Sequence, residues 1–160
     1  MDYGKQFEKD FKGSFQEHQG ARLLRLYDSV NGYKSIATIC DFIYYTYPRI
    51  GFFELKSVMG KSLPFTNITE NQWEGLLIRS KIPGMVGAVL IQFRDYKEGY
   101  LVPIQALETI KKTGKKSINI DEARELGMPL NLIYKRTRCS VDEHKFREDF
   151  IKYANKWEGV

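Results

Sequence analysis

The chain has 160 residues and a mass of 18.7 kDa, the size of one domain whose core needs no disulfides. With 42% hydrophobic and 28% charged residues, the composition excludes a disordered chain, and no apolar run reaches the roughly 20 residues that span a membrane. The polar N-terminal segment and only two cysteines favour a reducing cytoplasm over secretion. The net charge of +5 is typical either of a nucleic-acid partner or simply of a basic surface.

In the N-terminal half, Phe7, Phe11 and Phe15 recur every four residues, which predicts an amphipathic helix over residues 4–17. Three strands are expected next. They cover residues 22–27, 39–47 and 51–57, and the last two are joined so closely around Pro48 that they form an antiparallel hairpin. Residues 60–66 are predicted to form a loop.

In the C-terminal half, Thr69 and Gln72 have the spacing of a capping box, which predicts that a helix begins there. The apolar run 87–93 predicts a strand buried on both faces, paired with residues 100–102. Short helices are expected over 103–112 and 121–126, and a second capping box at 140–143 would open a terminal helix. Because no repeat or linker divides the chain, we expect a single mixed α/β domain over residues 1–160.

Two carboxylates lie within the apolar hairpin strands, where an unpaired charge is expensive to bury. If the turn centres on Pro48 and Arg49, Asp41 lies opposite Lys56. Glu54 then projects from the same face as Lys56, because side chains two residues apart share a face. A slip of one residue would turn Asp41 to the other face.

Two neighbouring carboxylates repel each other, and a divalent cation relieves the repulsion. Oxygen ligands without cysteine or histidine favour Mg²⁺ or Mn²⁺ over Zn²⁺. Such an ion activates water for phosphodiester hydrolysis, and Lys56 would stabilise the developing negative charge. From the residues alone, the alternative is an ordinary hairpin with a surface Glu54–Lys56 pair.

Asp41 followed by Glu54-Leu55-Lys56 is similar to the PD-(D/E)xK nuclease core. More specifically, the chain resembles the RecU-type Holliday junction resolvases, also called the penicillin-binding-protein-related factor A family, and its short phage members. The stretches that carry the resemblance run in family order: Gly4–Glu8, Cys40–Phe42, Phe53–Ser57, Gly60–Phe65, Asn71–Gln72 and Gly114–Ile118.

The resemblance implies a restriction-endonuclease-like α/β fold with a mixed central sheet flanked by helices. It also implies a homodimer and metal-dependent nicking of four-way DNA junctions. Asp41, Glu54 and Lys56 take the catalytic positions, and Asp41, Glu54 and Gln72 take the metal-ligand positions. Two features depart from the family: Ile39 stands where members carry a threonine ligand, and residues 28–38 replace a longer stalk.

The remaining candidates each have an ordinary explanation. Gln72 is either a ligand or only the third residue of the Thr69 capping box, and the resemblance favours the ligand. Glu8 is predicted as an acid beside the site or a surface residue. Lys5, Arg25 and Lys61 are predicted as phosphate contacts or solvated side chains.

The predicted function is a Mg²⁺-dependent endonuclease that resolves four-way junctions in recombination and repair, acting on DNA in the cytoplasm with no membrane partner. The enzymatic alternative is another PD-(D/E)xK nuclease that acts on duplex ends or flaps. The non-enzymatic alternative is a junction-binding protein without catalysis. Two basic clusters, at 111–116 and 135–138, are either DNA contacts or solvated faces.

Overall fold

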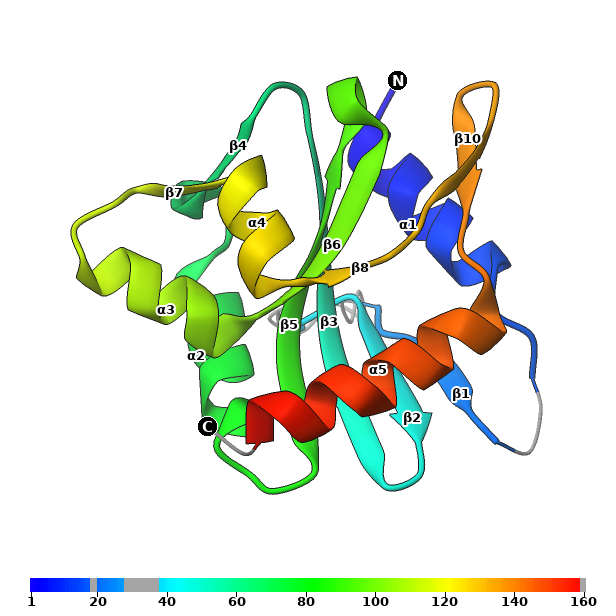
Figure 1. Ribbon diagram of the computed structural model, residues 1–160, viewed down its shortest axis with the longest axis horizontal. Coiled ribbons are helices and arrows are strands. Elements are labelled where there is room, and N and C mark those ends of the chain that lie inside the picture. Colours follow the sequence, from blue (N-terminus) through cyan, green and yellow to red (C-terminus); the bar gives the residue numbers. More distant parts are fainter. Residues whose placement is uncertain (18–19, 28–37, 159–160) are drawn as a thin grey trace, which may run out of the picture.

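The computed structural model describes residues 1–17, 20–27 and 38–158. At its centre lies a six-stranded sheet of order β1-β2-β3-β5-β6-β8, in which β3 and β5 run parallel and all other neighbours antiparallel (Figure 1). The strands are β1 (Arg22–Arg25), β2 (Phe42–Thr46), β3 (Arg49–Val58), β5 (Met85–Phe93), β6 (Glu98–Pro103) and β8 (Met128–Pro129). The expected mixed sheet flanked by helices is confirmed.

One face of the sheet is covered by α1 (Tyr3–Gly13) and α5 (Glu143–Glu158) (Figure 1). The predicted aromatic stripe of α1 is buried through Phe7 and Phe11, whereas Phe15 lies beyond the end of the helix. Phe146 of α5 meets Phe11 edge-on at 5.7 Å between ring centroids. These rings form a continuous core with the strands, which anchors α1 and its polar side chains beside β3.

The other face carries α2 (Glu70–Ser80), α3 (Ile104–Lys112) and α4 (Ile120–Leu126) (Figure 1). Helix α2 connects the parallel strands β3 and β5 and packs on them through Trp73 and Leu76. Strand β5 is buried on both faces, as its continuous apolar run predicts. The start of α2 therefore lies over the strand that carries Glu54.

The β2–β3 hairpin forms as predicted, but its register differs by two residues. The turn consists of Tyr47 and Pro48, so that Thr46 pairs with Arg49 and Phe42 with Phe53. Continuing this register sets Asp41 opposite Glu54 rather than opposite Lys56. Because the side-chain period of a strand is two, a shift of two residues leaves every side chain on its predicted face. The predicted pairing was wrong, whereas Glu54 and Lys56 share a face as predicted.

Some predicted elements need correction. The expected loop at 60–66 contains β4 (Ser62–Pro64), which pairs with β7 (Ser117–Asn119), and runs into the short helix η1 (Phe65–Asn67). A second hairpin, β9 (Ile133–Lys135) with β10 (Arg138–Ser140), and the short helix η2 (Arg94–Tyr96) were not predicted. These pieces are short, so hydrophobic periodicity has too few residues to reveal them.

The terminal helix α5 begins without the predicted capping box. Asp142 caps it instead, because the Asp142 carboxylate accepts a hydrogen bond from the backbone of Lys145 at 3.0 Å. Glu143 is the first residue of the helix, and its carboxylate accepts from the backbone of Gln16. The capping box at Thr69 and Gln72 is present as predicted.

Candidate active site

Asp41 lies at the end of the β2–β3 ladder, where β3 continues beyond its partner strand. The backbone N–H of Asp41 donates to the carbonyl of Phe53 at 2.9 Å. Strand β2 begins only at Phe42, so it offers no backbone carbonyl to the N–H of Leu55 further along β3. The Asp41 carboxylate accepts this hydrogen bond instead, at 2.8 Å. This bond fixes the Asp41 carboxylate at the level of Glu54 in the strand.

Glu54 is almost fully buried, at 3% exposure, and its two carboxylate oxygens differ in their surroundings. Oε1 lies 3.1 Å from the Lys56 ammonium and accepts a hydrogen bond from the Gln72 amide at 2.9 Å. Oε2 is buried and has no hydrogen-bond partner. Burial, followed by the charge of Asp41, raises the pKa of Glu54 to about 7, although Lys56 acts in the opposite direction.

A third carboxylate, Glu8 of α1, joins the group through Arg25. The Arg25 guanidinium lies 3.0 Å from Asp41 Oδ1 and 2.8 Å from Glu8 Oε2, and its carbon is 5.2 Å from the centre of the Phe42 ring. Burial and the nearby Asp41 raise the pKa of Glu8 to about 7, while Arg25 acts to lower it. Arg25 thus holds two acids in place without neutralising the repulsion among all three.

Gln72 takes part in the capping box of α2 and also contacts the candidate site. Its backbone N–H donates to the Thr69 hydroxyl at 3.2 Å, and its side-chain oxygen accepts from the Thr69 backbone at 3.0 Å. The side-chain nitrogen donates to Glu54. The amide oxygen, the atom that could bind a metal, is therefore held by the cap, and in this arrangement Gln72 positions Glu54.

The donor set suits a small oxygen-binding divalent cation. Two of the acids have raised pKa values, and a buried carboxylate oxygen of Glu54 lacks a partner. Within the described ranges, no three His, Cys, Asp or Glu side chains converge closely enough to enclose an ion. Mg²⁺ is commonly held by one or two carboxylates, with water and substrate phosphates completing its shell, and a pair such as Asp41 and Glu54 fits that donor set.

The two remaining predicted residues, Lys5 and Lys61, lie in different surroundings. Lys5 lines a hollow of about 330 Å³ together with Glu8 and with Arg25, which pairs with Asp41. Lys9, Lys12, Tyr27 and Phe42 complete this hollow, and the two lysines were missed although their spacing from Lys5 places all three on one side of α1. Lys61 precedes β4, and its backbone carbonyl accepts a hydrogen bond from the Ile120 backbone. Among the described residues it forms no ion pair with the site carboxylates.

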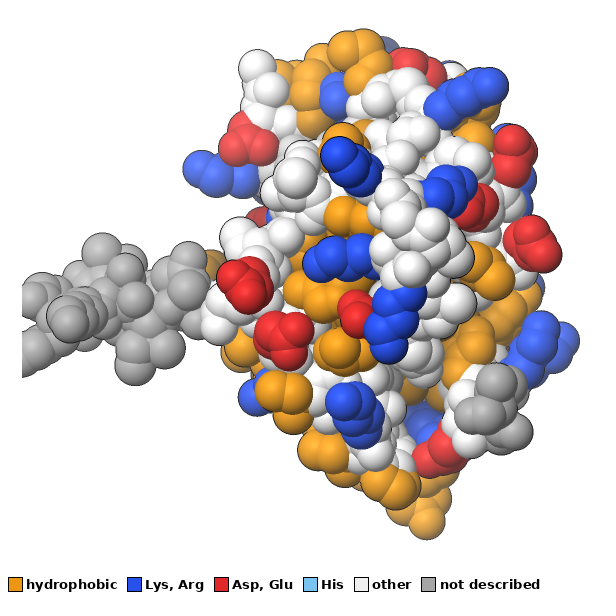
Figure 2. Space-filling view, turned by 90° about the vertical axis from the view of Figure 1, so that its left-hand side faces the viewer, with side chains coloured by type: hydrophobic (Ala, Val, Ile, Leu, Met, Phe, Trp, Pro, Cys, Tyr) orange, Lys and Arg blue, Asp and Glu red, His pale blue; other side chains and the backbone are white. Residues whose placement is uncertain are grey.

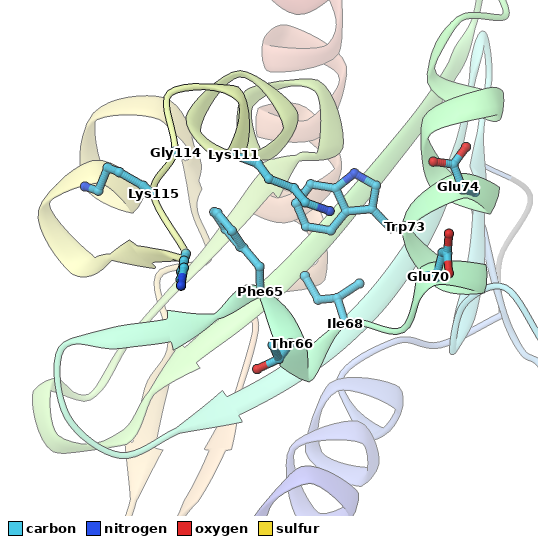
Figure 3. A pocket seen from close by; sticks show the side chains of 10 residues that line it. Phe65, Thr66, Ile68, Glu70, Trp73, Glu74, Lys111, Gly114 and Lys115 are labelled. Atoms are coloured by element: carbon cyan, nitrogen blue, oxygen red, sulfur yellow. The ribbon is translucent and has the colours of Figure 1, made fainter.

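A second hollow, of about 550 Å³, lies between η1, the first half of α2 and the end of α3 with the segment that follows it. Its floor is apolar, with Phe65, Ile68 and Trp73, and Lys111 covers the Trp73 ring at 4.4 Å (Figure 3). Figure 2 shows lysine and arginine side chains lying over hydrophobic ones on the side of the molecule that carries α3. This hollow belongs to the first basic cluster of the sequence and contains none of the three carboxylates.

A mixed sheet with an acid at the end of one strand and an acid-x-lysine pair on the next has the arrangement of the restriction-endonuclease-like nucleases. The model of the family described as RecU, Recombination protein U, matches residues 14–139, which include Asp41, Glu54, Lys56 and Gln72. The chain therefore belongs to this family, and the resemblance seen in the sequence is confirmed. The family is one of Holliday junction resolvases, which generally depend on a divalent metal.

Among solved structures, the chain is similar to Hjc of Archaeoglobus fulgidus, a Holliday junction resolvase from an archaeal hyperthermophile. The sequences are 18% identical, the match covers 69% of this chain and 83% of the Hjc chain, and the TM-score is 0.49. No curated protein matches the chain.

Proposed function

We propose that the protein is a Mg²⁺-dependent endonuclease that resolves four-way DNA junctions by paired nicks, with Mn²⁺ able to replace Mg²⁺. The observation that carries the proposal is the placement of Asp41 opposite Glu54 with Lys56 beside them. Residues 1–160 would act as one nuclease domain on DNA in the cytoplasm. None of the described helices is long and apolar enough to cross a bilayer.

Each site residue has a distinct task in this proposal. Asp41 and Glu54 would hold the metal, which supplies an activated water and stabilises the leaving oxygen. Lys56 carries its charge 3.1 Å from Glu54, where it would stabilise the negative charge that develops on the phosphate. Gln72 would orient Glu54 or, with its amide turned, offer its oxygen as a further ligand. Arg25 would position Asp41 and Glu8, and Lys5 would contact the DNA backbone.

A substrate panel tests the proposal against the nearest alternatives. With Mg²⁺ present, we expect nicks in two opposed strands of a mobile four-way junction and little cleavage of a linear duplex or a flap of the same sequence. Equal cleavage of the linear duplex would favour a nuclease that acts on ends or flaps. Junction binding without cleavage under any divalent metal would favour a pure binding protein.

Paired nicks need two active sites related by a two-fold axis, so we propose a homodimer. The surface we assign to it is the uncovered part of the β1–β2 face, where Leu24 is 52% exposed and Tyr45 is 49% exposed. Leu24→Glu is expected to turn the dimer into a monomer of 18.7 kDa in sedimentation experiments, while Lys152→Glu on α5 leaves it unchanged. A wild-type protein that sediments as a monomer would contradict the assignment.

The metal-free site should make stability depend on pH. Because the pKa values of Glu8 and Glu54 rise from 4.5 to about 7 on folding, the folded state retains protons that the unfolded chain releases between these values. Stability is therefore fully present below pH 4.5 and is lost as the pH rises through 7. A cation bound to the ionised acids restores it.

We accordingly expect Mg²⁺ to raise the Tm by several °C at pH 8 and to have little effect at pH 5, measured against EDTA by calorimetry. Both acids are ionised at pH 8 and largely protonated at pH 5. A Mg²⁺ effect of equal size at the two pH values would show that the ion binds elsewhere.

A further inference from the structure

The second basic cluster of the sequence lines a cavity outside the candidate active site. The cavity has a volume of about 240 Å³ and lies between the start of α1, the η2 segment and the β9–β10 hairpin, at the end of the molecule where the N-terminus is marked in Figure 1. Arg94, Lys97 and Arg136 line it, together with Tyr3 and Tyr134.

The cavity carries an excess of positive charge. Among the described residues, none of its three cations, Arg94, Lys97 and Arg136, has an ion pair with a carboxylate. The acid that lines the cavity is Asp10, and its oxygens are already occupied by Arg138 at 2.5 Å and by the backbone N–H of Cys139 at 3.1 Å. Three cationic residues therefore line one small space, and the acid beside them is already paired with Arg138.

Two of the three cations lie against aromatic rings. The Arg94 guanidinium lies 3.8 Å from the centre of the Tyr3 ring, and its buried Nε–H has no hydrogen-bond partner. The Lys97 ammonium lies 5.9 Å from the centre of the Tyr134 ring, whose hydroxyl is fixed by Gln92 at 3.0 Å. A planar guanidinium fixed on an aromatic ring is a ready donor for phosphate oxygens.

Two of the cations lie at tight turns: Lys97 ends the η2 helix, and Arg136 lies in the turn of the β9–β10 hairpin. Lys97 and Arg136 have φ angles of 53° and 61°, in the left-handed region that side chains other than glycine, asparagine and aspartate seldom adopt. Residues held in this region occur at binding sites and in tight turns. Glycine or asparagine would fit both positions at lower cost, yet both carry a long cationic side chain.

We propose that this cavity is a phosphate-binding site that recognises one phosphate group through Arg94, Lys97 and Arg136. Such a group can come from the DNA backbone or from a free phosphate or nucleotide. The DNA source rests on the proposed nuclease function, because it would give a junction arm a second contact outside the active site. Binding of a free phosphate or nucleotide does not depend on the proposed nuclease function.

The direct test uses inorganic pyrophosphate as the probe and NMR of the arginine Nε–Hε groups as the readout. We expect a saturable shift of the Arg94 signal in the wild-type protein, and affinity reduced about tenfold in Arg136→Asn, which removes the cation and suits the left-handed backbone. Lys135→Asn is the matched control, since Lys135 is exposed and does not line the cavity. Arg94→Lys should also weaken binding, because lysine lacks the planar donor pair.

Junction-binding experiments in Ca²⁺ then identify the source. If the DNA backbone supplies the phosphate, Arg136→Asn lowers junction affinity and reduces the salt slope by about one unit relative to Lys135→Asn. If a free phosphate supplies it, pyrophosphate binding is lost while junction affinity stays unchanged. The proposal is overturned if neither pyrophosphate nor the junction shifts the Arg94 signal, or if Arg136→Asn behaves as Lys135→Asn does in both assays. Neither readout requires cleavage, so a failure of the nuclease assignment is seen separately.

Discussion

Glu54→Gln is expected to abolish junction cleavage and, at the same time, to stabilise the metal-free protein. Glu54 is 3% exposed, one of its oxygens has no partner, and burial beside Asp41 raises its pKa to about 7. Gln removes the charge and keeps an oxygen for the bonds from Lys56 and Gln72. At pH 8 without metal we expect a gain on the order of 1–2 kcal/mol, seen as a Tm higher by a few °C.

The two readouts together distinguish a catalytic acid from a structural one. If the charge of Glu54 stabilised the fold, its neutralisation would destabilise the protein. If Glu54 is a metal ligand whose buried charge destabilises the metal-free fold, its neutralisation stabilises the protein. With Mg²⁺ at pH 8 the wild-type protein should instead have the higher Tm, because only the wild-type site keeps both charged carboxylates for the ion. If Glu54→Gln keeps cleavage within a fewfold of wild type, or is less stable than wild type in EDTA at pH 8, Glu54 is not the ligand we propose.

Lys56→Ala is expected to lower the single-turnover rate of junction cleavage by at least about a hundredfold. The ammonium lies 3.1 Å from Glu54, so its loss removes the positive charge that would face the reacting phosphate. Lys56 also lowers the pKa of Glu54, and without it that pKa rises further. The acid limb of the pH–rate profile should therefore move to higher pH in the variant.

Junction affinity in Ca²⁺ should change little in Lys56→Ala, because the charge acts on the transition state more than on the bound DNA. Lys152→Ala, an exposed lysine of α5, is the matched control and should cleave at the wild-type rate. An equal loss of affinity and rate would instead make Lys56 a simple phosphate contact.

The parts of the fold that the sequence predicted are those set by periodicity. The period of two in the hairpin placed Glu54 and Lys56 on one face, even though the predicted pairing was wrong by two residues. That error arose in the turn, because Tyr47 and Pro48 form it where Pro48 and Arg49 were expected. A short run between two strands does not reveal which two residues turn, since several placements satisfy the same hydrophobic pattern.

The site could be predicted where it lies on strands and not where it depends on side chains from distant segments. Nothing in the spacing of Glu8 and Arg25 shows that a guanidinium joins them to Asp41, because that contact exists only once α1 packs beside β1. Gln72 could not be decided from its position either. The cap takes its oxygen and Glu54 takes its nitrogen. Residues 28–37, where the family stalk was expected to be short, lie outside the described residues.

The most direct test of the central claim is cleavage of a four-way junction labelled on two opposed strands, comparing wild type with Asp41→Asn in Mg²⁺. Asn keeps the size of Asp41 and an oxygen that can accept from the Leu55 backbone, and it removes the charge that faces Glu54. The account predicts paired nicks by the wild-type protein and none by Asp41→Asn, with junction affinity in Ca²⁺ within a fewfold of wild type. Nicking by Asp41→Asn at a rate close to wild type would contradict it.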